Sequence, residues 1–68
     1  MNFDDFPASK IMGVIDEYVH SARDREVMRR RLLDGETYQE IADAMALAPR
    51  TVRAICSRHR GRIFKHLY

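Results

Sequence analysis

Several residue types are scarce in this sequence of 68 residues, which has one cysteine, no tryptophan, three glycines and two prolines. The lone Cys56 excludes an internal disulfide and a pair of thiols for zinc. A reducing compartment suits it, so we predict a cytoplasmic protein. No apolar run approaches the roughly 20 residues of a membrane span. The sequence also lacks a basic region followed by an apolar stretch at its start, so no secretory signal is predicted.

Acidic residues are absent from the last twenty positions. Residues 1–48 carry six basic residues and all ten acids, a net charge of −4, whereas residues 49–68 carry six basic residues and no acid, a net charge of +6. These six are Arg50, Arg53, Arg58, Arg60, Arg62 and Lys65. A segment of one sign repels itself unless a polyanion lies against it, which favours a nucleic acid as partner. The alternative is a solvated basic face.

The sequence also lacks the residue patterns of a catalytic or metal site. There is no Ser/His/Asp arrangement, no glycine-rich phosphate loop and no pair of catalytic carboxylates. His20, His59 and His66 have no acid or second cysteine at a spacing that completes a ligand set. We therefore predict that the protein is not an enzyme and has neither a metal nor a cofactor.

The chain is short enough to form one domain, residues 1–68. In its first half, apolar residues recur at helical spacing. A first helix is predicted from about 9 to 20, with Ser9 as its N-cap. Its apolar stripe consists of Ile11, Val14, Ile15, Tyr18 and Val19. A second helix is predicted from about 23 to 34, with Ser21 and Asp24 at its start and Gly35 as its left-handed stop. Val27 and Met28 face the core with Leu32, Leu33 or both, and most of the run Arg29–Arg31 is expected to be solvated or paired with acids.

Residues 37–57 have the pattern of a helix, a tight turn and a second helix. Thr37 and Glu40 can form a capping box, and Pro49 suits the first position of the second helix. The apolar positions that face inward are Ile41, Ala42, Met45, Val52 and Ile55. The helical pattern continues to about residue 67, either as the same helix or as a separate short helix, and Gly61 is the candidate for a break or kink. The predicted fold is all-α, with four or five short helices around a helix-turn-helix and no sheet.

The segment 25–55, REVMRRRLLDGETYQEIADAMALAPRTVRAI, resembles region four of bacterial sigma factors, and more widely the LuxR/GerE-type helix-turn-helix domains. Val27 precedes Gly35 by eight positions with Arg31 between them, and this spacing favours the sigma type. The resemblance implies a domain that binds promoter DNA. Arg50 and Ala54 stand where sigma factors often carry an acid and a glutamine that read the −35 bases. Ala46 and Ala48 replace the usual turn glycine and the usual Ser or Thr cap.

We interpret the protein as a DNA-binding transcriptional regulator that inserts the helix starting at Pro49 into the major groove. Arg50 and Arg53 are the leading base or phosphate contacts, and Arg58, Arg60, Arg62 and Lys65 are expected on phosphates. The remaining candidate DNA-binding residues are Thr37, Tyr38, Gln39, Pro49, Thr51, Ala54 and Ser57.

A domain this small makes few contacts with double-stranded DNA, so affinity requires a homodimer or a larger partner. Candidate dimer surfaces are the stripe of the first helix and a set formed by Phe64, Leu67 and Tyr68; core packing is the alternative for both. The alternative function is a protein-interaction module, an adaptor or decoy that binds RNA polymerase or another regulator.

Overall fold

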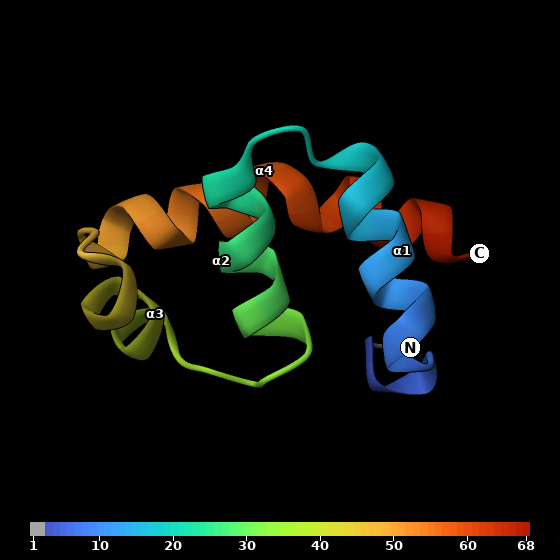
Figure 1. Ribbon diagram of the computed structural model, residues 1–68, viewed down its shortest axis with the longest axis horizontal. Helices are drawn as coiled ribbons and strands as arrows, with labels where there is room; N and C mark the ends of the chain where they lie inside the picture. Colours follow the sequence, from blue (N-terminus) through green and yellow to red (C-terminus); the bar gives the residue numbers. More distant parts are fainter. Residues whose placement is uncertain (1–2) are drawn as a thin grey trace.

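The computed structural model describes residues 3–68, apart from the side chain of Asp4, and within them it contains helices and no strand (Figure 1). A short 3-10 turn, η1, spans Phe3–Asp5. The α-helices are α1 (Ala8–Tyr18), α2 (Ala22–Leu32), α3 (Tyr38–Met45) and α4 (Pro49–Leu67). The prediction of an all-α fold with four or five short helices is confirmed.

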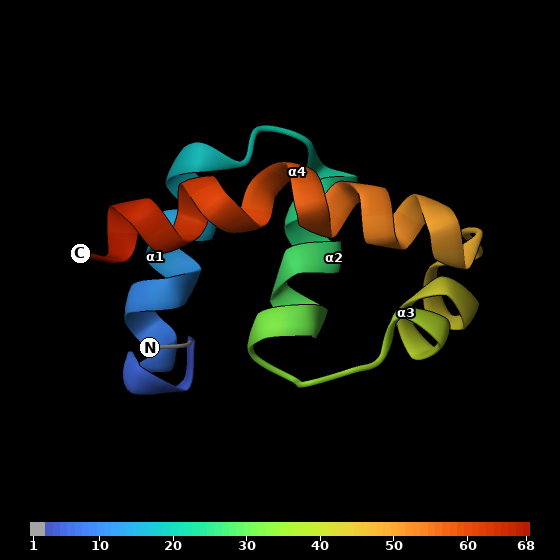
Figure 2. The ribbon, with the colours of Figure 1, turned by 180° about the vertical axis from the view of Figure 1, so that it is seen from behind.

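Helix α4 is the element against which α1, α2 and α3 all pack. Its 19 residues give it a length of about 28 Å, close to the longest dimension of the molecule, 31 Å. Figures 1 and 2 show α3 beside the beginning of α4, α2 beside its middle and α1 beside its C-terminal half. The long helix therefore carries both a packing surface and, on its other sides, the exposed basic residues.

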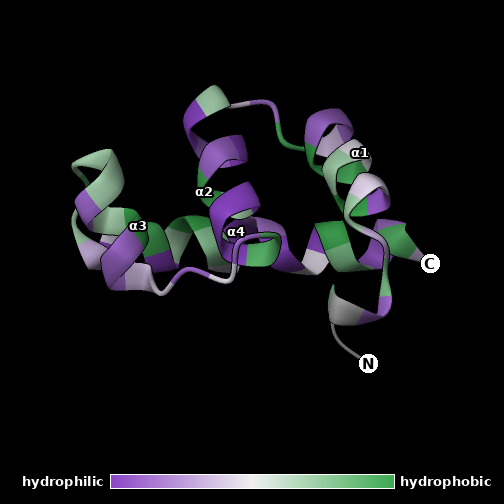
Figure 3. Ribbon diagram, turned by 60° about the horizontal axis from the view of Figure 1, so that its bottom comes forward, coloured by the Kyte–Doolittle hydropathy of each residue, from purple (hydrophilic) through white to green (hydrophobic). Residues whose placement is uncertain are grey.

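The core consists of apolar side chains that converge on α4 from the other helices. Figure 3 shows that each helix carries both hydrophobic and hydrophilic residues. Most of the positions predicted to face inward are buried, whereas four lie half-buried at the edge of the core: Tyr18, Leu32, Leu33 and Met45. The stripe of α1 and Leu67 therefore belong to the core, which was the alternative, and their expected use as dimer surfaces is wrong. The fully or almost fully buried side chains include Val19, Val27, Met28, Ile41, Val52, Ile55, Ile63 and Leu67.

Local signals place the starts of α2 and α3 correctly. The Ser21 hydroxyl accepts a hydrogen bond from the Asp24 backbone N–H at 3.3 Å, and Thr37 and Glu40 form the predicted capping box. Gly35 has the predicted left-handed backbone, with φ 67°. It lies two residues beyond Leu33, the C-cap that follows the last residue of α2.

Two details of the predicted helices are wrong, and one alternative that the sequence left open is decided. Helix α1 begins at Ala8 after Pro7, whose φ of −65° already suits a helix start, so Ser9 lies inside the helix and does not cap it. It ends at Tyr18, because Val19 turns to an extended conformation. Helix α4 runs without a break through Gly61, since Ile63 and Leu67 are anchored in the core beyond it and outweigh the cost of about 1 kcal/mol for a helical glycine.

Candidate nucleic-acid interface

The turn between α3 and α4 is formed by three residues, Ala46, Leu47 and Ala48. Ala46 adopts the left-handed conformation with φ 55°, and the Leu47 N–H donates to the Ala42 carbonyl at 2.9 Å. Leu47 packs against the core, which fixes the direction in which the chain leaves the turn. Pro49 then occupies the first turn of α4, where its missing N–H costs nothing. The turn places the beginning of α4 at one end of the molecule (Figure 1).

The first turns of α4 present a polar, positively charged side to solvent. Val52 is fully buried and Ile55 almost so, and these two contacts fix the rotation of the helix about its axis. Arg50, Arg53 and Ser57 are exposed and follow one another at intervals of three and four, so they share the opposite side. In residues 3–68, Arg50 and Arg53 form no ion pair with a carboxylate.

The ring of Tyr38 connects the beginning of α3 to this side of α4. The guanidinium carbon of Arg53 lies 5.5 Å from the ring centroid, and that of Arg31 lies 4.5 Å from it. The Arg31 Nη1 also donates to the Glu36 backbone carbonyl at 2.9 Å. The structure thus brings Tyr38 and Arg53 together and adds Arg31, which the sequence analysis did not single out as a contact. No local pattern indicates a contact between a ring and two cations on three different helices.

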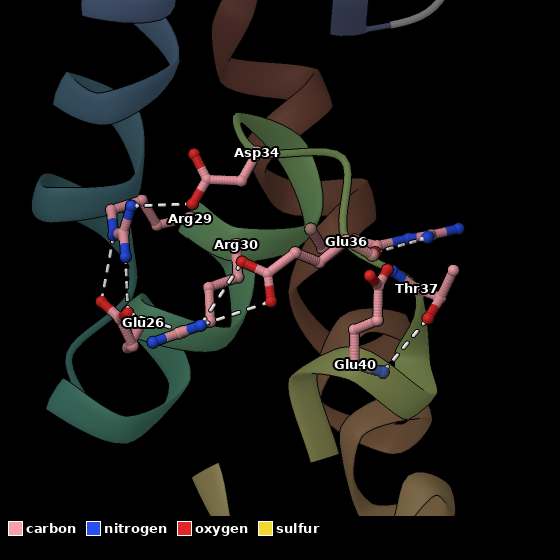
Figure 4. Close-up of polar contacts among 8 residues, drawn as sticks. Glu26, Arg29, Arg30, Asp34, Glu36, Thr37 and Glu40 are labelled. Atoms are coloured by element: carbon pink, nitrogen blue, oxygen red, sulfur yellow. Dashed lines mark hydrogen bonds and ion pairs between the residues drawn. The ribbon is translucent and has the colours of Figure 1, made fainter. Parts of the chain in front are cut away.

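Arg29 and Arg30, the neighbours of Arg31, are held in a network of carboxylates (Figure 4). Glu26 accepts from the Arg29 Nη2 at 2.6 Å and from the Arg30 Nε at 2.8 Å. The hydrogen bond from Arg29 holds the pKa of Glu26 below its usual value. Asp34 and Glu36 complete the network, at 3.1 Å from Arg29 and 3.3 Å from Arg30. The prediction of paired arginines is confirmed for these two, whereas Arg31 has no carboxylate partner within residues 3–68.

Apart from Tyr38, the polar side chains at the beginning of α3 form their hydrogen bonds within this segment. The Thr37 hydroxyl accepts from the Glu40 N–H at 3.1 Å, and the Glu40 carboxylate accepts from the Thr37 N–H at 2.8 Å. The latter hydrogen bond keeps the pKa of Glu40 below its usual value, so a negative charge lies at this helix end. Gln39 is exposed and its amide donates to Asp43 at 2.9 Å.

The basic residues in the second half of α4 fall on two sides of the helix. Arg60 continues the row of Arg53 and Ser57, at positions i, i+4 and i+7. Arg58, Arg62 and Lys65 form a second row with the same internal spacing on another side, where Thr51 also lies. Arg58 reaches toward Asp24, with 3.8 Å between its Nη1 and the Asp24 Oδ2. The structure therefore does not bring all the basic residues of the last third to one surface.

A buried carboxylate fastens α2 to the middle of α4. Asp24 is 3% exposed and accepts hydrogen bonds from the His59 Nε2 at 2.8 Å and the Arg23 Nε at 3.1 Å. Burial raises the pKa of Asp24, but the hydrogen bonds from His59 and Arg23 outweigh this effect and lower the pKa below its ordinary value. The sequence analysis assigned Asp24 only to the start of α2 and missed this pairing.

Two kinds of feature are absent from the part of the chain that the structure describes. No group of three or more His, Cys, Asp or Glu side chains in residues 3–68 is arranged to hold a metal ion. Nor does any helix there combine the length and the apolar character that crossing a membrane requires.

Comparison with known proteins connects this geometry to one family. A family model described as bacterial regulatory proteins, luxR family, matches residues 19–68. The match includes α2, α3 and α4 and leaves η1 and α1 outside. No match was found among curated proteins or among solved structures.

Proposed function

The chain belongs to the LuxR family of bacterial regulatory proteins, and from this membership we propose that it binds double-stranded DNA with the first turns of α4 in the major groove. DNA binding in transcription regulation is the function of the family's helix-turn-helix domain. The wider of the two resemblances, to LuxR/GerE-type helix-turn-helix domains, is therefore confirmed. The closer relation to sigma region four stays a prediction, as do a homodimer and RNA polymerase as partners.

The observation that carries the proposal is the exposed row that starts with Arg50 and Arg53. Both side chains are solvent-exposed on a helix whose opposite side is locked in the core by Val52 and Ile55. An α-helix with its side chains is about 10–12 Å in diameter, so the first turns of α4 fit a major groove about 12 Å wide. The row can therefore reach base edges without rearrangement of the core.

Arg53 is the residue we assign to base reading. Its stem leaves the helix next to Tyr38, and the ring contact at 5.5 Å restricts the positions of the guanidinium. An arginine whose fork is held in place loses less side-chain entropy when it forms a bidentate pair with guanine. Arg50, one turn earlier, contacts a base or the adjacent phosphate.

The two basic rows of α4 suit the two phosphate backbones that flank a helix in the major groove. Arg60 lies on the same side as Tyr38 and Arg31, and we assign Arg60 and Arg31 to the phosphates of one strand. Arg58, Arg62 and Lys65 lie on the other side and would reach the phosphates of the second strand. Phosphate contacts set the register and orientation on the duplex without reading sequence.

The test is fluorescence anisotropy on a pool of random DNA duplexes at several salt concentrations, followed by sequencing of the bound fraction. Binding should weaken with salt, with a slope of about −0.9 per phosphate contact, and the pool should enrich a sequence. Arg53→Glu should lower affinity at least about tenfold and abolish the enrichment, because a base contact contributes about 1–3 kcal/mol of discrimination.

Lys10→Glu is the matched control, since it makes the same change of charge on an exposed residue of α1. It should bind almost as the original chain does. Retained binding and enrichment in Arg53→Glu would show that α4 does not read DNA in this way. Absence of binding even at low salt would favour the protein-interaction alternative, for which RNA polymerase is the first partner to test.

A further inference from the structure

A groove of about 440 Å³ lies between the beginning of α3, the middle of α4 and the turn η1. Its volume falls in the range of about 300–1,000 Å³ that is typical of small-molecule sites. The side chains that line it are Phe3, Tyr38, Cys56, Ser57, Arg60 and Phe64. Phe3 comes from outside residues 19–68, so the groove is not contained in the part that matches the family.

Aromatic rings form the apolar walls of this groove. The rings of Phe3 and Phe64 meet edge to face, with 5.2 Å between their centroids and an interplanar angle of 70°. Phe64 also contacts Phe6 and Tyr68, at 6.3 and 5.2 Å. This aromatic cluster holds Phe3 and Phe64 in place and leaves them as groove walls on which a planar ring can pack.

The charge of the groove is positive. Among the side chains that the structure describes, no acidic one lines it, and the guanidinium of Arg60 lies 5.8 Å from the centroid of the Phe3 ring. Burial raises the pKa of the Cys56 thiol, and the nearby positive charges of Arg31 and Arg60 oppose that rise. The floor is thus a buried thiol near two guanidiniums, neither of which has a carboxylate partner within residues 3–68.

We propose that this groove binds a small molecule with a planar aromatic ring and one acidic group. The ring packs against the wall that Phe3 and Phe64 form together, and the acidic group pairs with Arg60 and accepts a hydrogen bond from the Ser57 hydroxyl. Tyr38, Ser57 and Arg60 also belong to the candidate DNA interface, so a bound ligand opposes DNA binding. This opposition rests on the proposed function, whereas ligand binding itself does not.

The test is a titration of the 68-residue chain with 1-naphthoate in the absence of DNA, followed through the backbone amide signals by NMR. We expect saturable shifts centred on residues 56–64. The neutral analogue 1-naphthamide should bind about tenfold more weakly, because it cannot form charge-assisted hydrogen bonds with Arg60. Arg60→Gln should remove most of this preference.

Two glycines provide a matched pair of variants. A Cβ at Gly61, which borders the groove, or at Gly13, on the exposed side of α1, meets no atom within 4 Å. Both are exposed positions in helices, where leucine has a higher helix propensity than glycine. Gly61→Leu should weaken 1-naphthoate at least about tenfold by occupying the groove, and Gly13→Leu should leave its affinity unchanged.

Several outcomes would overturn the proposal. They are the absence of saturable shifts, shifts scattered over the surface, or equal affinity in Gly61→Leu and the original chain. Inorganic phosphate that shifts the same amides as strongly as 1-naphthoate would identify a phosphate subsite instead of an aromatic site. Because this titration contains no DNA, its failure is distinct from a failure of the anisotropy experiment.

Discussion

Replacing Asp24 by asparagine keeps the shape of the side chain and removes its charge. The Asp24 side chain is only 4% exposed and accepts from the His59 Nε2 at 2.8 Å. An ionised carboxylate can only accept, so the Nε2 must carry the proton. The variant replaces a charge-assisted hydrogen bond with a neutral one in the contact between α2 and α4.

The expected cost follows from the burial of the two partners. Hydrogen bonds to charged groups contribute about 1.5–3 kcal/mol. The His59 side chain is 14% exposed, whereas water can replace the lost partner of Arg23, whose side chain is 49% exposed. We therefore expect Asp24→Asn to lower the free energy of unfolding by about 2 kcal/mol at pH 7. A chain of this length has roughly 3–10 kcal/mol in total, so the melting temperature should fall by about 8–16 °C.

The effect should depend on pH in a defined direction. The pKa of Asp24 is lowered in the folded state, so its contribution is present above the unfolded value of about 3.9. That contribution is lost as the pH falls through the folded value. The difference between the original chain and Asp24→Asn should therefore shrink as the pH falls below about 4. The pKa values of Glu26 and Glu40 are also lowered, but both proteins keep these residues, so their effects cancel in the difference.

Urea denaturation followed by circular dichroism at several pH values between 3 and 7 measures this difference. Asp16→Asn is the control, because Asp16 is an exposed aspartate on α1, and its change should lie within about 0.5 kcal/mol. A cost for Asp24→Asn below about 0.5 kcal/mol would refute the reasoning. A cost that stays constant over this pH range would also refute it, because the protonated, neutral Asp24 would then stabilise the fold as much as the carboxylate does.

Three further substitutions test the turn and the interface. Ala46→Gly should stabilise the fold by about 0.5–1 kcal/mol, because a left-handed alanine is strained. The control Ala44→Gly, inside α3, should destabilise the fold by a similar amount. Urea denaturation measures both changes. Ala48→Ser should add about 1 kcal/mol by capping α4, which lacks a side-chain cap, and no gain in the same assay would contradict the assigned helix start. Tyr38→Leu should weaken DNA binding in the anisotropy assay and reduce sequence enrichment, since it removes the ring beside Arg53. Tyr38→Phe keeps the ring and should preserve both the affinity and the enrichment. Equal losses in the two variants would exclude a role for the ring.

The sequence by itself determined the features that depend on residues within about one helical turn of each other. The capping box of Thr37 and Glu40, the cap at Ser21, the left-handed Gly35 and the position of Pro49 are all of this kind. Helical periodicity also predicted the buried residues, because one apolar side of each helix must face a common core.

Only the tertiary structure decided how the sides of different helices meet. Asp24 and His59 are 35 positions apart. The contact of the Tyr38 ring with the guanidiniums of Arg31 and Arg53 joins residues from three helices. The continuity of α4 through Gly61 also depends on packing, since Ile63 and Leu67 beyond it are held in the core. Periodicity fixes which side of a helix is apolar, but the angle and register at which two helices cross depend on the fit of all their side chains. That fit joined Phe3 to the middle of α4 and divided the basic residues of α4 between two sides.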